Sequence, residues 1–232
     1  MAISHRIRLE DLIEFEPLTD HQKEVFDAYE KDYSLVLAGS AGTGKTFMAM
    51  ALALEDVLDK NTRYDKVVIV RSIVPTRDIG FLPGNEEEKK DAYTGPYKSI
   101  CTELFKDPQA WDKLVAQGLV EFLSTSFIRG TTLNNAVVII DEMQNLNFHE
   151  LDSVITRIGR DCKFVMSGDY YQSDFDKDKD RKGILHFLEI VEQLKKFKIV
   201  EFGWEDIVRS DFVRDYIMTK EMLQRHEKKI YT

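Results

Sequence analysis

The sequence predicts an α/β domain in which a mostly parallel, doubly wound sheet lies between two layers of helices. Strand-like apolar runs alternate with helix-like segments about five times along the chain. The apolar runs are nearly continuous, as in KVVIV at 66–70, which is typical of strands buried on both faces of a parallel sheet. A length of 232 residues with 43% hydrophobic residues suffices for one domain with a sizeable core.

The elements follow from these patterns. We expect strands over residues 34–38, 66–70, 119–123, 136–140, 163–167 and 198–202. We expect helices over residues 19–32, 47–58, 94–104, 108–117, 148–158, 184–194 and 211–226. The charged run at 86–91 is interpreted as a solvated face, and the run of alternating charge at 174–182 as a loop.

The first 17 residues alternate apolar and charged side chains and end at Pro17. This pattern fits an edge strand or a docking arm, and both interpretations stay open. We therefore divide the chain into an N-terminal arm, 1–17, and one α/β domain, 18–232.

Composition excludes several classes of protein. No run of eighteen apolar residues exists, so no transmembrane helix is expected. The N-terminal basic residues are not followed by an apolar segment, which argues against a secretory or organellar signal and predicts a cytoplasmic protein. Cys101 and Cys162 stand far apart, which argues against a disulfide scaffold or a zinc site. A net charge of −9 argues against sequence-independent nucleic-acid binding except through a local patch.

A phosphate-binding loop follows the first predicted strand. GSAGTGKT at 39–46 matches the pattern G-x-x-x-x-G-K-[ST], and its glycines let successive N–H groups point inward around a phosphate. Lys45 would reach the β- and γ-phosphates, and the Thr46 hydroxyl would hold Mg²⁺. The alternative is a glycine-rich turn with a surface lysine. The predicted nucleotide contacts in this loop are Gly39, Ser40, Ala41, Gly42, Thr43, Gly44, Lys45 and Thr46.

Two further strands end in polar residues. AVVII at 136–140 runs directly into Asp141 and Glu142, at the edge of an open sheet where ligands bind. Asp141 would help to hold Mg²⁺ and Glu142 would activate a water molecule, whereas the alternative is that the two acids cap a helix. The strand at 163–167 leads to Gln172, an amide suited to sensing a γ-phosphate.

Gln22 allows two interpretations. Thr19 and Gln22 have the spacing of a capping box at a helix start, and on the residues alone we favour this role. The alternative is that the amide of Gln22, just upstream of the phosphate loop, hydrogen-bonds an adenine base.

Taken together, these motifs resemble the PhoH-like ATPase family, whose core is similar to the first RecA-like domain of superfamily 1 helicases. The resemblance covers about residues 19–217. The stretches that carry it are residues 19–22, GSAGTGKT, RSIVPTRDIGFLPG, FIRGTTLNNAVVIIDEMQN, LDSVITRIGRDCKFVMSGDYYQSD and EDIVRSDFVRDYI.

The resemblance assigns roles to several residues. It makes Gln22 the residue that recognises adenine, and Gln172 the residue that couples the γ-phosphate to nucleic acid. It also makes Arg209 a γ-phosphate ligand. With one RecA-like domain, Arg209, or alternatively Arg157 or Arg181, would reach the nucleotide of a neighbouring subunit. The alternative for Arg209 is a helix-end salt bridge with Asp206 or Asp211.

By the same resemblance, helicase loops that touch single-stranded nucleic acid correspond to positions that include Arg71, Thr76, Arg77 and Arg129. Phe81 and Tyr93 would stack on bases. The alternative is that all of these are ordinary surface residues. Two features depart from the family pattern: Met143 replaces a small residue after Asp141-Glu142, and the charged loop at 176–181 replaces a proline-rich one.

The expected function is a Mg²⁺-dependent ATPase that couples hydrolysis to RNA or single-stranded DNA. The resemblance implies a homo-oligomeric ring, such as a hexamer. The alternatives are a nucleotide-dependent binding switch with little turnover, a small-molecule kinase, and a nucleic-acid-binding module without enzymatic activity.

Overall fold

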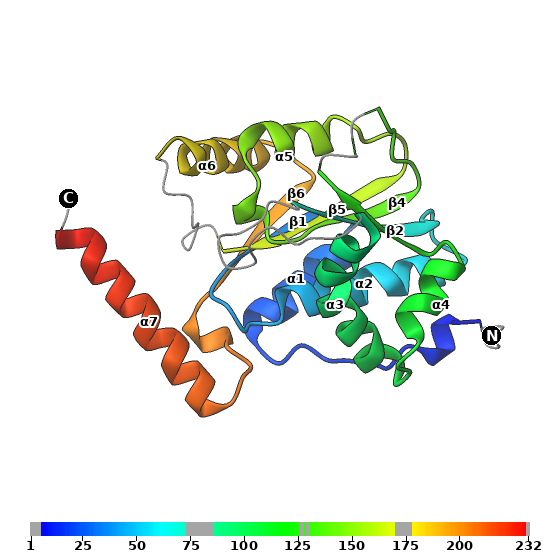
Figure 1. Cartoon of the computed structure of the whole chain (residues 1–232), viewed down its shortest axis with the longest axis horizontal. Helices are drawn as coiled ribbons and strands as arrows, with labels where there is room; N and C mark the ends of the chain where they lie inside the picture. Colours follow the sequence, from blue (N-terminus) through cyan, green and yellow to red (C-terminus); the bar gives the residue numbers. More distant parts are fainter. Residues whose placement is uncertain (1–5, 73–85, 126–127, 129, 170–177, 231–232) are drawn as a thin grey trace.

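The computed structural model describes residues 6–72, 86–125, 128, 130–169 and 178–230. They form a six-stranded sheet with the strand order β3-β2-β4-β5-β1-β6, and every pair of neighbouring strands is parallel (Figure 1). The strands are β1 (Ser34–Gly39), β2 (Lys66–Arg71), β3 (Val120–Ser124), β4 (Ala136–Ile140), β5 (Cys162–Gly168) and β6 (Phe197–Phe202). Each predicted strand is present within one residue at either end, and the predicted fold class is confirmed.

Helices cover both faces of the sheet (Figure 1). One face carries α1 (Asp20–Glu30), α2 (Lys45–Leu58), α3 (Glu86–Phe105) and α4 (Ala110–Ala116), and the other carries α5 (Phe148–Ile155) and α6 (Asp178–Glu192). The last helix, α7 (Asp211–Ile230), extends away from the sheet. Short 3-10 turns lie at η1 (Leu9–Asp11), η3 (Met143–Asn145) and η5 (Trp204–Asp206).

Alternate side chains of the central strands fill two separate cores. In β4, Val137 and Ile139 face the α1–α4 layer, whereas Val138 and Ile140 face the α5–α6 layer. All four are fully buried. Because successive residues of a strand point to opposite faces, burial of both faces requires apolar residues at every position. This requirement explains why the strands are continuous apolar runs in the sequence.

Two helices begin earlier than predicted. Residues 178–182, expected in a loop, form the beginning of α6, and α3 begins at Glu86 rather than at the predicted residue 94. A run of alternating charges is compatible with an exposed helical turn as well as with a loop, so the charge pattern alone did not distinguish them. The predicted helix at 148–158 ends at Ile155; residues 156 and 157 form a turn, and Ile158 forms an isolated bridge with Leu133.

Over its described part, from Arg6 onward, the N-terminal segment forms no strand, so the edge-strand interpretation is wrong there. It has an irregular path with one 3-10 turn, η1. Ile7 is buried, and Ile13 donates its backbone N–H to the Leu104 carbonyl oxygen at 2.9 Å. The arm therefore packs on the same core as α1–α4.

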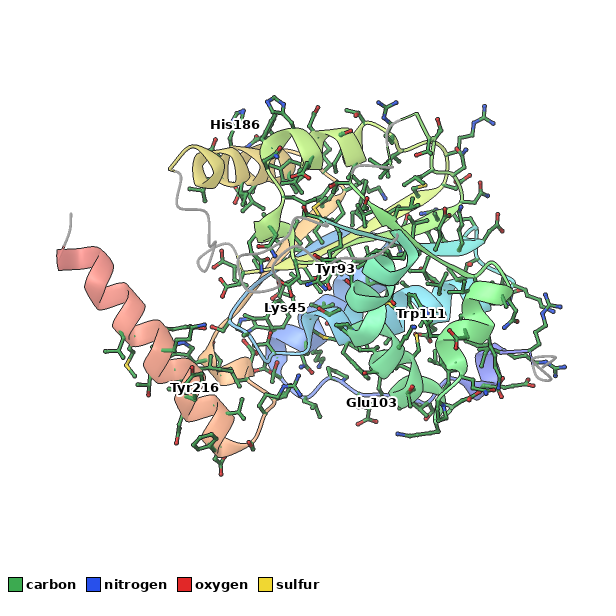
Figure 2. All side chains as sticks on the ribbon, in the orientation of Figure 1. Lys45, Tyr93, Glu103, Trp111, His186 and Tyr216 are labelled. Atoms are coloured by element: carbon green, nitrogen blue, oxygen red, sulfur yellow. The ribbon has the colours of Figure 1, made fainter. Side chains whose placement is uncertain are left out.

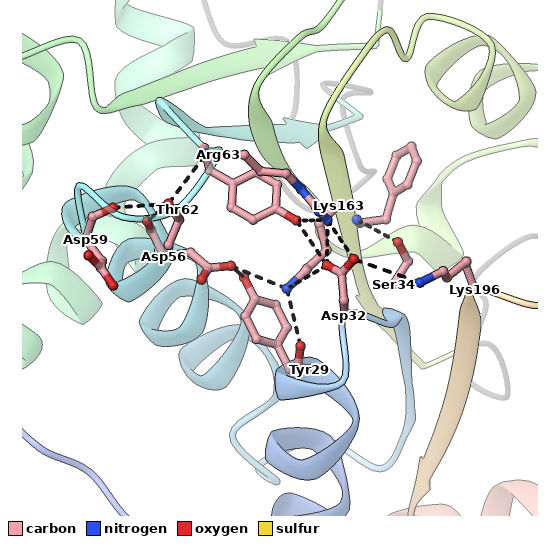
Figure 3. Close-up of polar contacts among 11 residues, drawn as sticks. Tyr29, Asp32, Ser34, Asp56, Asp59, Thr62, Arg63, Lys163 and Lys196 are labelled. Carbon is pink, nitrogen blue, oxygen red and sulfur yellow. Dashed lines mark hydrogen bonds and ion pairs between the residues drawn. The ribbon is translucent and has the colours of Figure 1, made fainter.

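A buried lysine, Lys163, contacts residues of several elements at the edge of the sheet where the parallel strands begin (Figure 3). The Nζ atom of Lys163, at the start of β5, lies 3.7 Å from the centre of the Tyr29 ring and 3.4 Å from Asp56 Oδ2. Asp32 contributes a second carboxylate 3.5 Å away and binds Arg63 at 2.6 Å. This cluster ties α1, α2 and β5 together at the edge opposite the phosphate loop.

None of the helices in the described part of the chain combines the length and apolar character that crossing a membrane requires. Cys101 and Cys162 are both free thiols.

Candidate nucleotide-binding site

The phosphate loop joins β1 to α2 through left-handed backbone conformations. Gly39, Gly42 and Gly44 have φ values of 118°, 76° and 82°, which favour residues without a Cβ atom. At Gly39 an added Cβ would also overlap the Phe202 carbonyl oxygen of the neighbouring strand β6. The turn therefore favours glycine at all three positions, and close packing against β6 also requires it at Gly39.

Lys45 is the first residue of α2 (Figure 2). Its Nζ donates to the carbonyl oxygens of Gly39 at 2.9 Å and Ser40 at 2.6 Å. Burial lowers the pKa of Lys45 below its usual value of 10.5, and the nearby carboxylates of Asp169 and Glu142 oppose this shift. The ammonium group thus lies inside the loop, held by carbonyl oxygens and surrounded by acidic groups.

Asp141 follows β4 and is almost fully buried, with 4% of its surface exposed. Its Oδ1 accepts hydrogen bonds from Thr46 Oγ1 at 3.0 Å and from Ser167 Oγ at 2.6 Å. Its Oδ2 accepts one from Tyr97 Oη at 2.8 Å. The adjacent hydroxyl and carboxylate oxygens of Thr46 and Asp141 are the hard oxygen donors that suit Mg²⁺, so this pair fits the predicted metal site.

Glu142 has a left-handed backbone, with φ 52° and ψ 46°. Its Oε2 accepts a hydrogen bond from Gln144 Nε2. Gln144 also accepts, through Oε1, a 3.1 Å hydrogen bond from the backbone N–H of Asp169. Gln144 therefore links the acidic end of β4 to the polar end of β5.

Gln22 lies in α1 against the phosphate loop. Its Nε2 donates to the Thr43 carbonyl oxygen at 3.0 Å, and its Oε1 accepts from the backbone N–H of Leu18 at 2.8 Å. The helix cap is instead Thr19, whose Oγ1 accepts from the Gln22 backbone N–H at 3.3 Å. The side chain of Gln22 thus bridges the loop and the segment before α1, and does not close the capping box that the spacing suggested.

A cavity of about 1040 Å³ lies above the loop. One part of its wall is apolar and includes Phe15, Phe26 and Phe47, whose rings pack edge to face at 5.2 and 5.8 Å from Phe15. The other part is polar and holds the loop, Lys45 and the two acids. The polar residues along this wall include Gln22, Lys45, Thr46, Arg71, Asp141, Glu142, Gln144, Asp169 and Arg209.

Comparison with known families agrees with this geometry. The family model described as "PhoH-like protein" matches residues 14–221. The chain belongs to the PhoH-like family. The resemblance predicted from the motifs is thereby confirmed.

Several curated relatives are similar to this PhoH-like chain. The PhoH-like protein of Mycobacterium leprae (strain TN) is 31% identical over 212 residues, which are 91% of this chain and 60% of the relative. Protein PhoH of Escherichia coli (strain K12) is 32% identical over 191 residues, or 82% of this chain and 53% of the relative. The chain thus spans little more than half the length of these relatives.

Among solved structures, the large terminase of a thermophilic bacteriophage, in complex with ADP, is similar at a TM-score of 0.48 and 12% identity. The match covers 86% of this chain and 49% of the terminase chain. The Pif1 helicase from Candida albicans is similar at a TM-score of 0.37 and 17% identity, over 86% of this chain and 43% of that one. At these identities the likeness concerns the fold alone.

Residues that follow the last strand of the PhoH-like domain contact the phosphate loop. Val208 donates its backbone N–H to the Gly42 carbonyl oxygen at 3.0 Å, and the neighbouring Arg209 lines the cavity. Asp206, one expected partner of Arg209 in a salt bridge, instead contacts His21 Nδ1 at 2.8 Å. From α7, Glu221 Oε2 accepts hydrogen bonds from Ser40 Oγ at 3.0 Å and from Trp204 Nε1 at 2.6 Å.

The remaining predicted residues fall into two groups. Arg71 is described and lines the cavity, whereas Arg157 lies at the opposite edge, where its carbonyl oxygen accepts from the Leu133 backbone N–H. Outside the described residues lie Thr76, Arg77, Phe81, Arg129, Gln172 and the side chain of Arg181.

Sequence reasoning missed several groups that contact the predicted residues. Tyr97 comes from α3, which carries no recognised motif, and Glu221 lies just beyond the last motif stretch. Ser167 lies within a stretch that carries the family resemblance, but the motif gave it no role. Gln144 had one available signal, because an amide two residues after Glu142 lies close enough to contact it. Met143, the departure from the family pattern, is buried in the α5–α6 core.

Proposed function

We propose that this PhoH-like domain binds Mg²⁺-ATP in the cavity and hydrolyses it. The observation that carries the proposal is the convergence of Lys45, Thr46, Asp141 and Glu142 on one cavity from the ends of β1 and β4. The triphosphate would lie on the loop, where inward N–H groups, the start of α2 and the Lys45 ammonium all favour negative charge. Carbonyl oxygens that hold Lys45 in this structure would give way to phosphate oxygens.

The apolar part of the cavity suits the base. Phe15 and the surrounding rings offer a surface for a purine, and Gln22 lies where this surface meets the loop. To contact adenine, the Gln22 amide would exchange its bond to Leu18 or Thr43 for one to the base edge. The N-terminal arm would then form part of the nucleotide site.

Thr46 and Asp141 would hold the metal, and bound Mg²⁺ would neutralise charge on the β- and γ-phosphates. Glu142 would accept the proton of the attacking water. For this role its carboxylate must turn from Gln144 toward the water. We also propose that Gln172 contacts the γ-phosphate and that Arg209, which lines the cavity of its own chain, approaches the phosphates in cis.

The decisive experiment compares ATP binding and ADP formation in the wild type, Lys45→Ala and Glu142→Gln. We expect Lys45→Ala to lose ATP binding. We expect Glu142→Gln to bind ATP with about wild-type affinity while turnover falls by about 10² or more, because it keeps the shape but removes the base. Glu205→Gln, an exposed acid outside the cavity wall, is the matched control. Wild-type turnover in Glu142→Gln would refute the assignment.

A binding switch with little turnover is the second candidate. It is favoured by one observation, the hydrogen bond that holds Glu142 on Gln144. Gln144→Ala separates the two functions: it should raise ADP formation if this bond restrains the base, and it should leave negligible turnover unchanged in a switch. A kinase would be indicated by faster ADP formation when phosphate acceptors are added.

We further propose that hydrolysis is coupled to RNA or single-stranded DNA and that the chain acts as a homo-oligomer. The family resemblance supports the first proposal. The second is supported by α7, which extends from the sheet and carries Tyr216 (Figure 2). Phe212, Tyr216 and Leu223 on this helix are exposed by 81%, 63% and 60%. ATPase rates with oligo(U) or oligo(dT), together with the mass in solution, test both. No stimulation by either polymer would refute the coupling, and a fully active monomer would refute the ring.

A further inference from the structure

Tyr97 on α3 places a hydroxyl group inside the proposed metal site. The residue is fully buried, and its ring packs against Trp111 and Phe122 with centroid distances of 6.1 and 6.0 Å. A phenylalanine would provide the same packing. The hydroxyl donates a 2.8 Å hydrogen bond to Asp141 Oδ2, so its contribution is directed at the carboxylate and not at the core.

Arg71 holds the other side of this hydroxyl. It ends β2, the strand beside β4, and its guanidinium group lies within hydrogen-bonding reach of the Tyr97 hydroxyl. The guanidinium group has donors and no acceptor, so the Tyr97 oxygen accepts from Arg71 and its proton is directed to Asp141. Burial by itself lowers the pKa of Arg71, but Tyr97 and Asp141 raise it above its usual value, so the cation is retained. Tyr93 packs on the guanidinium at 5.8 Å.

The contacts of Asp141 divide between its two oxygens. Oδ1 is paired with Thr46 and Ser167, and Oδ2 is paired with Tyr97. Fixing both oxygens fixes the rotation of the carboxylate plane, and it keeps Oδ1 beside the Thr46 hydroxyl. A metal site depends on such outer partners because they orient the groups that hold the ion.

We infer that Tyr97 is a positioning residue that orients Asp141 for Mg²⁺, and that Arg71 acts in the nucleotide site by orienting Tyr97. The inference rests on the proposed Mg²⁺-ATP site. It gives Arg71 a role different from the nucleic-acid contact that the resemblance implied. The hydrogen bonds run in one direction, from Arg71 through Tyr97 to Asp141.

The test uses Tyr97→Phe, which keeps the ring, and Tyr29→Phe as a matched control. Tyr29 is also buried and donates to a carboxylate, Asp56 Oδ2, at 2.7 Å, but at the opposite edge of the sheet. The affinity of the wild type and of each variant for a non-hydrolysable ATP analogue is measured with saturating Mg²⁺ and with EDTA. The quantity compared is the factor by which Mg²⁺ strengthens binding.

We expect Tyr97→Phe to reduce this factor about 10-fold relative to the wild type. Binding in EDTA should stay within about two-fold, because the loop is untouched. Tyr29→Phe should leave both affinities unchanged even where it lowers the melting temperature. Arg71→Gln should also reduce the factor, and adding it to Tyr97→Phe should produce little further loss, since the two act in series.

An unchanged Mg²⁺ factor in Tyr97→Phe would overturn the inference, and so would an equal loss of affinity with and without Mg²⁺, which a merely structural role predicts. If the wild type fails to bind the analogue at all, the proposed function fails and the inference fails with it. If the wild type binds but Mg²⁺ gives no enhancement, the metal site is refuted separately from nucleotide binding.

Discussion

Replacing Glu221 by alanine should weaken the attachment of α7 to the phosphate loop. Glu221 is 6% exposed, and one of its oxygens accepts hydrogen bonds from Ser40 Oγ and Trp204 Nε1. A hydrogen bond to a charged group contributes about 1.5–3 kcal/mol. The two bonds share one oxygen, and Trp204 is only half-buried, so we expect the free energy of unfolding to fall by about 2–3 kcal/mol.

Urea denaturation followed by circular dichroism measures this loss. Ser40→Ala and the double variant complete a thermodynamic cycle, whose coupling energy isolates the bond between α7 and the loop. We expect a coupling of about 1 kcal/mol. Glu205→Ala, an exposed acid beside Trp204, is the control and should change stability by less than about 0.5 kcal/mol.

Two results would refute this reasoning. A loss below about 0.5 kcal/mol in Glu221→Ala would mean that the buried carboxylate is worth no more than a surface group. A coupling energy near zero, despite a large loss in each single variant, would mean that Glu221 and Ser40 stabilise the protein independently. Either result would mean that α7 does not stabilise the phosphate loop through Glu221.

Three further outcomes are expected. Lys163→Met should lower the free energy of unfolding by about 3 kcal/mol in urea titrations, because it leaves the Asp56 carboxylate without its buried cation; a loss below about 1 kcal/mol would contradict this. Gly39→Ala should lower the melting temperature much more than Gly118→Ala, since both have positive φ but only Gly39 has a neighbouring carbonyl in the way; equal losses would mean that the clash relaxes. Burial and the neighbouring Asp56 raise the pKa of Glu55 above 4.5 in the folded protein. Ionised Glu55 therefore lowers the free energy of unfolding at pH values above this raised pKa. The cost disappears below the pKa of Glu55 in the unfolded chain. Because the Glu55 side chain is exposed and screened by solvent, Glu55→Gln should stabilise the protein by at most a few tenths of a kcal/mol at pH 7. The gain should fade as the pH falls toward 4.5, and a gain that persists in acid would contradict this cause.

The strands could be predicted closely because their burial constrains every residue. β4 has no polar position between Ala136 and Ile140, and a run of this kind has few other interpretations. The start of α6 was missed because its first residues are charged, and a run of charges does not separate a helix from a loop. Residues 178–182 satisfy the rules for a loop and for an exposed helical turn equally well.

The contiguous part of the site could be predicted for a different reason. A phosphate-binding loop needs glycines at fixed spacing within one turn, so the eight successive residues from Gly39 to Thr46 are enough to predict it. The hydrogen-bond partners of Asp141 cannot be predicted from a local pattern of this kind. Tyr97 and Ser167 are ordinary residues 44 and 26 positions away in the sequence, and only the fold brings their hydroxyls to one carboxylate.

The supporting contacts explain how the site keeps an unfavourable backbone. Glu142 has a left-handed conformation that costs free energy for a residue with a side chain, and such conformations persist only where surrounding interactions impose them. Gln144 donates a hydrogen bond to the Glu142 carboxylate, and Tyr97 donates one to the preceding residue, Asp141. Met143, the residue that follows Glu142, is buried in the α5–α6 core. The geometry of the motif therefore depends on Tyr97 from α3 as well as on Met143 and Gln144 within the motif itself. A substitution such as Tyr97→Phe removes one of these contacts. It should therefore alter the position of Glu142, and with it turnover, while Glu142 itself is kept.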